Sequence, residues 1–151
     1  MKKNIAIASD HAGFQLKETL KAEIISLGYN VIDLGTNSTN SVDYPDYGYK
    51  LASEVSSGKA DLGVAICGSG VGISIAANRK PKIRAVLAQT AEVAKLGRQH
   101  NNANVLALGA RIISEDMAKE IVRMFLSTPF EGGRHENRVI KLGSRNSSDK
   151  K

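Results

Sequence analysis

Short apolar runs alternate along the chain with longer segments whose apolar residues recur at helical spacing. The runs are rich in β-branched residues and predict five strands, at residues 4–9, 30–34, 62–66, 85–87 and 105–108. The third run, Leu62–Ile66, is continuously apolar, as expected for a parallel strand that is covered on both faces.

The segments between these runs predict helices. Residues 14–27 place apolar side chains at helical spacing and end at Gly28, and residues 36–46 are expected to form a polar loop. Further helices are expected at residues 47–57, 73–79, 90–100, 115–127 and 134–142. Strands that alternate with helices of about ten to fourteen residues predict the α/β class, a doubly wound parallel sheet with helices on both faces.

In such sheets ligands bind beyond the carboxyl ends of the strands, where successive crossovers leave in opposite directions. If the first and third strands are neighbours, Asp10 and His11 share a crevice with the turn that follows Leu62–Ile66. Arg111 follows the fifth strand and is expected to face the same crevice.

Length and composition predict one globular domain over residues 1–143, followed by a solvated, disordered tail at 144–151. The net charge is +6, of which the tail carries three positive charges and one negative, leaving +4 on the domain. Aromatic residues make up only 5% of the chain and no basic stripe is interleaved with them, so an acidic small molecule is expected rather than nucleic acid. The chain has no apolar run of membrane-spanning length, no signal-like start and a single cysteine, so a cytoplasmic protein without a membrane partner is expected.

A glycine-rich turn, Cys67-Gly68-Ser69-Gly70-Val71-Gly72, joins the third strand to the next helix. Alternate glycines let backbone N–H groups approach a ligand, and the helix directs its positive dipole end at the same point. The turn could hold a phosphate, stabilise an oxyanion or place a thiolate beside a reacting carbon. The glycine spacing departs from the dinucleotide fingerprint, because position 73 is Ile, and this disfavours nicotinamide binding.

Cys67 lies just after a strand and just before a helix, a position that favours a thiolate and a chemical role. The three histidines show no metal-binding spacing, so neither a metal nor a cofactor is expected. Arg134 and Arg138 are four residues apart and could grip one phosphate from the same helix face, although a solvated basic face is the commoner reason for such a pair.

Several motifs in order resemble the type B ribose-5-phosphate isomerases and the related galactose-6-phosphate isomerase subunits. They are S-D-H-A-G at 9–13, D-Y-P at 43–45, I-C-G-S-G-V-G-I-S-I-A-A-N at 66–78, R-Q-H-N at 98–101 and E-G-G-R-H-E-N-R at 131–138. The resemblance implies a three-layer α/β/α domain with a five-stranded parallel sheet whose order begins 2-1-3. It also implies a homodimer or a dimer of dimers, with a C-terminal helix that extends to the partner and active sites shared between subunits.

The resemblance also implies the reaction, a metal-free interconversion of ribose 5-phosphate and ribulose 5-phosphate through an enediolate. Cys67 would be the base, since the branch of the family that lacks this cysteine uses a glutamate at the position that is Ile73 here. Ser69 and the amides of the turn would bind the enediolate oxygen. The amide-bearing glycines of the turn are Gly68, Gly70 and Gly72.

Substrate contacts carry over in the same way. Asp10 and His100 resemble the residues that bind the sugar ring and help to open it, while Tyr44 and Asn101 would contact hydroxyl groups. The residues that resemble the phosphate ligands are His11, Arg111, Arg134 and Arg138.

Three alternatives stay open at the level of sequence. Another aldose phosphate, such as allose or galactose 6-phosphate, could be the substrate. A thiol hydrolase or transferase would use Cys67 as a nucleophile activated by His100. A non-catalytic phosphosugar-binding module would bind without chemistry.

Overall fold

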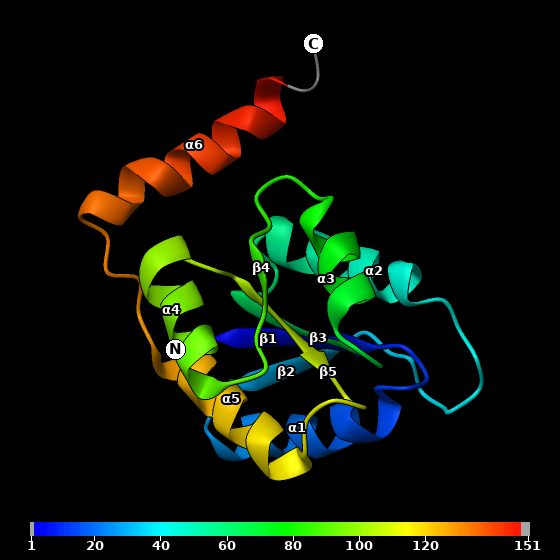
Figure 1. The fold of residues 1–151 in the computed structure, drawn as a ribbon. Coiled ribbons are helices and arrows are strands. Elements are labelled where there is room, and N and C mark those ends of the chain that lie inside the picture. The colour runs from blue at the N-terminus through cyan, green and yellow to red at the C-terminus, as the bar shows by residue number, and fades with distance from the viewer. Residues whose placement is uncertain (1, 149–151) are drawn as a thin grey trace.

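Five parallel strands form one sheet in the order β2-β1-β3-β5-β4 (Figure 1). The computed structural model describes residues 2–148, with strands β1 Asn4–Ser9, β2 Asn30–Asp33, β3 Leu62–Cys67, β4 Ala85–Leu87 and β5 Val105–Gly109. The helices are α1 Phe14–Ser26, α2 Tyr44–Ser56, α3 Val71–Asn78, α4 Ala91–Asn101, α5 Glu115–Ser127 and α6 Arg134–Ser148. The α/β class, the parallel sheet and the 2-1-3 start of its order are therefore confirmed.

Helices cover both faces of the sheet because successive strand side chains point to opposite faces. On β1, Ile5 and Ile7 pack into a core with α1, α4 and α5, whereas Ala6 and Ala8 pack into a second core with α2 and α3. The strand β3 is buried at every position, which explains its continuous apolar sequence. In Figure 1, α6 extends away from these layers.

The carboxyl ends of β1, β3 and β5 lie together at one edge of the sheet. Ser9 pairs with Ile66, and Cys67 pairs with Gly109. The crossover from β1 leads outward to β2, while β3 lies on the opposite side of β1. The predicted switch point between β1 and β3 is therefore confirmed, and it brings Asp10 beside the turn that follows Cys67.

Two element boundaries differ from the sequence prediction by three residues or more. The predicted loop at residues 36–46 was wrong at its end, because α2 already begins at Tyr44, with Pro45 in its first turn. A proline such as Pro45 is compatible with either a loop or the first turn of a helix, and here it lies in the first turn of α2. The last helix, predicted to end near Leu142, continues to Ser148, since Gly143 is only a weak helix breaker. Of the predicted tail, residues 149–151 lie outside the described part of the chain.

Within residues 2–148, none of the helices has both the length and the apolar character that crossing a bilayer requires.

Candidate active site

The turn after β3 presents a thiol to the start of α3. Gly70 adopts a left-handed conformation (φ 80°) and caps the helix, and its amide donates a hydrogen bond to the Cys67 Sγ at 3.2 Å. The Cys67 residue is only 4% exposed. This hydrogen bond holds the sulfur at the start of α3.

Glycine is required at Gly70 by space as well as by conformation. A Cβ atom there would lie 2.6 Å from Leu87 Cδ1 and 2.8 Å from the carbonyl carbon of Leu108, and L side chains disfavour this φ value. The turn is also bound to the residues after β5, since the amides of Ala110 and Arg111 donate to the carbonyls of Cys67 and Gly68 at 2.9 Å each. The backbone around the thiol is consequently fixed on both sides.

A cavity of about 330 Å³ opens over this turn. Its lining comes from the ends of β1, β3 and β5 and from the start of α2, and we call it the Cys67 pocket. The lining residues are Asp10, Tyr44, Cys67, Gly68, Ser69, Gly72, Arg111 and Ile112. Seven of these eight lining residues were selected by the sequence analysis, and only Ile112 was not.

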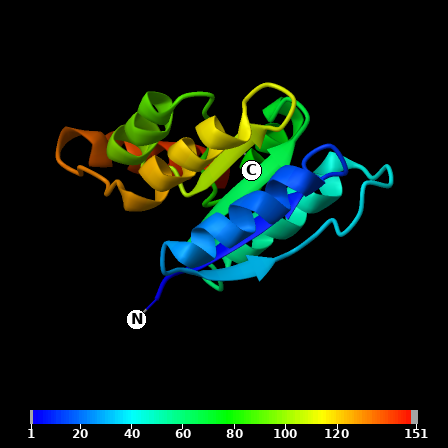
Figure 2. The same cartoon turned by 90° about the horizontal axis from the view of Figure 1, so that it is seen from below.

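The loops around the pocket hold His11 and Tyr44 in place. The Nδ1 atom of His11 accepts a hydrogen bond from the Val42 amide at 3.1 Å, which leaves Nε2 as the ring's donor. Figure 2 shows the connection from β2 to α2 reaching the loop that follows β1. Tyr44 packs against the turn, because a Cβ atom on Gly72 would lie 2.6 Å from the tyrosine ring.

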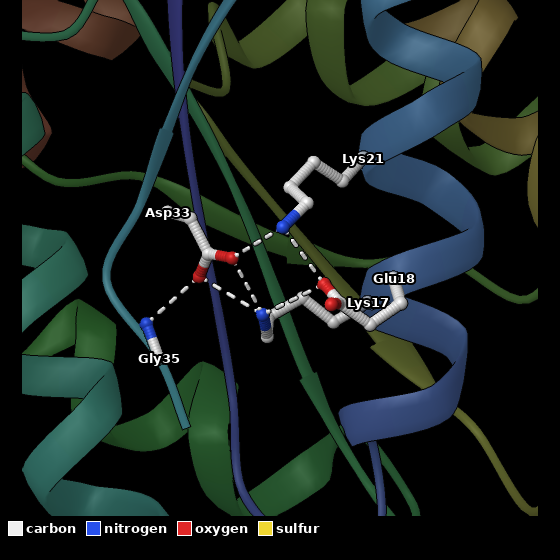
Figure 3. Close-up of polar contacts among 5 residues, drawn as sticks. All are labelled: Lys17, Glu18, Lys21, Asp33 and Gly35. Atoms are coloured by element: carbon white, nitrogen blue, oxygen red, sulfur yellow. Dashed lines mark hydrogen bonds and ion pairs between the residues drawn. The ribbon is translucent and has the colours of Figure 1, made fainter. Parts of the chain in front are cut away.

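An ion-pair network around the buried Lys17 anchors that connection (Figure 3). Lys17 of α1 is fully buried, and its Nζ donates to both carboxylate oxygens of Asp33 at 2.9 and 2.8 Å. Lys21 adds a contact to Asp33 at 3.0 Å, and Glu18 pairs with both lysines. The Gly35 amide donates to Asp33 Oδ1 at 2.9 Å, so the network fixes the chain where it leaves β2.

Burial by itself would raise the pKa of Asp33. Hydrogen bonds from Lys17, the Gly35 amide and Lys21 outweigh that effect and hold the pKa below its ordinary value. Asp33 therefore stays ionised at neutral pH, and its connection to α1 is maintained.

Four of the selected residues lie elsewhere in the chain. His100 and Asn101 end α4, immediately before β5 begins, so they lie at the amino edge of the sheet. Cys67 lies at the carboxyl edge, and β5 alone spans roughly 15 Å between the two edges. Arg134 and Arg138 lie on α6, together with His135, whose ring stacks on that of His100 at the end of α4.

We call the group at the end of α4 the His100 cluster, and it includes two residues that the sequence analysis missed. His135 stacks on His100 with ring centroids 4.3 Å apart, and its Nε2 lies 3.5 Å from Glu131 Oε1. The i,i+4 spacing of Glu131 and His135 could have suggested that these two side chains interact. Nothing in the sequence indicates that His135 contacts His100, which lies 35 positions earlier. The cluster consists of His100, Glu131, Arg134, His135 and Arg138.

Two arginines hold the end of α4, of which Arg98 is buried and Arg84 is partly buried. Arg98 is 8% exposed and donates to the carbonyls of Thr128 and Ala103 at 3.0 and 2.6 Å, and to Asn102 Oδ1 at 3.0 Å. Arg84 donates to the carbonyl of Asn101 at 3.0 Å. Arg84 thus satisfies a free carbonyl of the helix end, while Arg98 ties α4 to the residues that follow it and to the end of α5, and both fix the backbone that carries His100.

Within residues 2–148, His100, Glu131 and His135 offer three potential metal ligands within 4.8 Å of one another. The histidine lone pairs lie in the ring planes, and the two planes are only 16° from parallel. Lone pairs in stacked rings do not converge on one point, so a cation would require at least one ring to turn. In the observed arrangement the cluster is built for ring stacking.

Comparison with known proteins gives one consistent result. The Ribose/Galactose Isomerase family matches residues 5–142. Ribose-5-phosphate isomerase B of Escherichia coli is 48% identical over 137 residues, covering 91% of this chain and 92% of that protein. The structure of Clostridium thermocellum ribose-5-phosphate isomerase B superposes with a TM-score of 0.95 at 48% identity, covering 96% of this chain and 98% of that one. That of Mycoplasma genitalium ribose-5-phosphate isomerase B with bound ribulose 5-phosphate has a TM-score of 0.91 at 41% identity, covering 95% and 96%.

Proposed function

The chain belongs to the ribose/galactose isomerase family as a type B ribose-5-phosphate isomerase, and we propose that it interconverts ribose 5-phosphate and ribulose 5-phosphate with Cys67 as the base. The observation that carries the proposal is the Cys67 pocket, in which a buried thiol receives an amide hydrogen bond beside Asp10 and Arg111. The bound ribulose 5-phosphate of the Mycoplasma genitalium relative supports a five-carbon substrate.

The reaction moves one proton between neighbouring carbons. In the open-chain aldose, the Cys67 thiolate takes the proton from C2, and the C2–H electrons form the C1–C2 double bond of an enediolate. The thiol then returns the proton to C1, while a proton passes between the two oxygens, and the ketose results. A positioned base of this kind contributes about a hundredfold to ten-thousandfold in rate.

The turn supplies donors for the developing oxyanion. The Gly70 amide donates its hydrogen bond to the Cys67 sulfur. It therefore contacts the base and is not available to the enediolate oxygen. Ser69 Oγ accepts the Val71 amide at 3.2 Å, which leaves its hydroxyl proton available for an enediolate oxygen. Together with the remaining amides of residues 68–72, this hydroxyl would stabilise charge that exists only during the reaction.

We further propose that the active site is completed by a second copy of the chain. Within one chain the His100 cluster and the Cys67 pocket lie at opposite edges of the sheet. A partner placed so that its His100 cluster faces this pocket would add ring-opening and phosphate-binding groups to it. In such a dimer His11 and Arg111 would approach the phosphate from one subunit, and Arg134 and Arg138 from the other.

Exposed apolar side chains around the edge strand β4 suit such an interface. They lie on α3 and α4, which flank β4, and on α6. Burying them against a copy of themselves would remove apolar surface from water and cover the sheet edge. These residues are Val71, Ile75, Val93, Leu96, Ile140 and Leu142.

The test is to follow ribose 5-phosphate by NMR in deuterated water, in the presence of a chelator. We expect ribulose 5-phosphate to form with deuterium from the solvent at C1. Direct transfer of the original C2 proton to C1 competes with this exchange. Allose 6-phosphate and galactose 6-phosphate, run in parallel, would establish the preferred substrate. Binding without deuterium exchange would contradict the proposal and indicate a phosphosugar-binding module. A covalent adduct on Cys67 would indicate a nucleophile.

A further inference from the structure

His135 is the one buried member of the His100 cluster that the proposed mechanism leaves without a role. It is only 7% exposed, although it lies on α6, a helix of mostly polar residues. We propose that His135 is a positioning residue, whose stacked imidazole fixes the orientation in which His100 opens the sugar ring. This inference rests on the proposed function and names a residue through which that function acts.

The backbone is shaped to bring His135 onto α4. Gly132 and Gly133 both have positive φ values, 69° and 54°, and the His135 amide donates to the Gly132 carbonyl at 3.0 Å. The Glu131 amide donates to the Gln99 carbonyl at 3.1 Å, which joins this turn to the residue before His100. These backbone hydrogen bonds hold the start of α6, which carries His135, against the end of α4, which carries His100.

The side chains complete the arrangement. The rings of His135 and His100 lie 16° from parallel with centroids 4.3 Å apart, so His100 has a flat surface against one of its faces. Glu131 Oε1 approaches His135 Nε2 at 3.5 Å and limits rotation of that ring. A ring with one face supported and its partner restrained has fewer orientations to sample before reaction.

The charges around His135 favour its neutral form. Burial lowers the pKa of His135, and the neighbouring His100, Arg134 and Arg138 lower it further, while Glu131 opposes them. Two stacked imidazolium rings would repel each other. A neutral His135 avoids this repulsion, so the stack is maintained.

Ring opening can be separated experimentally from proton transfer at carbon. Ribose 5-phosphate is mainly a cyclic furanose and must open before it reacts. Ribulose 5-phosphate is acyclic, because its C5 oxygen carries the phosphate. Exchange of its C1 hydrogen with deuterium therefore needs Cys67 but no ring opening.

The experiment compares both rates in the unmodified chain and in the variants His135→Ala and His135→Phe. A Glu136→Ala variant at the exposed neighbouring position is the matched control. For His135→Ala we expect turnover of ribose 5-phosphate to fall by about tenfold to a hundredfold, and deuterium exchange into ribulose 5-phosphate by less than about threefold. His135→Phe keeps a flat ring and is expected to recover most of the turnover, and Glu136→Ala to match the unmodified chain.

An equal fall in both rates, or a fall in neither, would overturn the proposal. So would a His135→Phe variant as impaired as His135→Ala. Loss of activity in the unmodified chain on chelation, restored by Zn²⁺, would identify the cluster as a metal site instead. If the unmodified chain performs neither reaction, the proposed function fails, and that result is distinct from all of these.

Discussion

Cys67 differs from an ordinary buried cysteine in what its sulfur contacts. Most buried cysteines pack as small apolar residues, whereas Cys67 Sγ accepts the Gly70 amide and borders a cavity that also contains Asp10. Its place between a strand end and a helix start was visible in the sequence. The amide donor was not, because it depends on the left-handed conformation of Gly70.

We expect Cys67→Ala to reduce isomerisation by about a hundredfold to ten-thousandfold, because the proton at C2 loses its base. Cys67→Ser should be similarly inactive, since a hydroxyl ionises far less readily than a thiol. Steady-state rates with ribose 5-phosphate give the measurement. Thermal unfolding serves as the control for folding, and near-full turnover in Cys67→Ala would remove Cys67 from the mechanism.

Gly70→Ala tests the turn independently of the thiol. Its Cβ would collide with Leu87 and Leu108, and the strained φ alone costs about 1–3 kcal/mol, so we expect lower stability and at least about a hundredfold loss of turnover. Gly58→Ala is the matched control, because Gly58 has a similar φ of 83° with open space around it. Gly58→Ala should lose stability but keep its turnover, and equal activity losses in the two variants would contradict the role of the turn.

At the scale of elements, the network between α1 and the end of β2 links the core to the pocket. Lys17 is buried in α1, and Asp33 ends β2 and binds the Gly35 amide. The connection from there leads to Val42, which binds His11, and then to Tyr44 on the pocket wall. Long-range ion pairs of this kind have no sequence signature, and the helical spacing of α1 gave no reason to select Lys17.

Removing the buried cation should be costly. Lys17→Met leaves the partly buried Asp33 with only Lys21 as an ionic partner, and we expect a loss of about 2–4 kcal/mol in the free energy of unfolding. Lys21→Met is the control, because Lys21 is one-third exposed and its loss should cost less than about 1 kcal/mol. Urea unfolding measures both, and equal losses would show that burial of Lys17 is unimportant.

The lowered pKa of Asp33 predicts the pH dependence of that stabilisation. An acid whose pKa is lower in the folded state stabilises the fold above its unfolded pKa of about 3.9, and the effect disappears as pH falls through the folded value. The stability difference between the unmodified chain and Asp33→Asn should therefore be constant from pH 7 to about pH 5 and shrink below about pH 4. A difference that grows on acidification would contradict this assignment.

At the scale of the whole molecule, the fold was readable because buried parallel strands appear as continuous apolar runs separated by helical patterns. The sequence also grouped Asp10 with Cys67 correctly, since both follow neighbouring strands. It did not separate His100 from them, because residue types do not reveal the edge of the sheet at which a side chain lies. The order of the elements does reveal this edge, because α4 ends just before β5 begins and His100 therefore lies at the amino edge of the sheet.

This separation makes assembly of the active site from two subunits the central claim. The most direct test combines Cys67→Ala chains with Arg134→Ala/Arg138→Ala chains, each inactive alone, by co-refolding. A randomly mixed dimer population places one intact site in each heterodimer, so we expect recovery to about a quarter of the unmodified rate of ribulose 5-phosphate formation. A mixture that stays as inactive as its components, although mixed dimers have formed, would contradict the account.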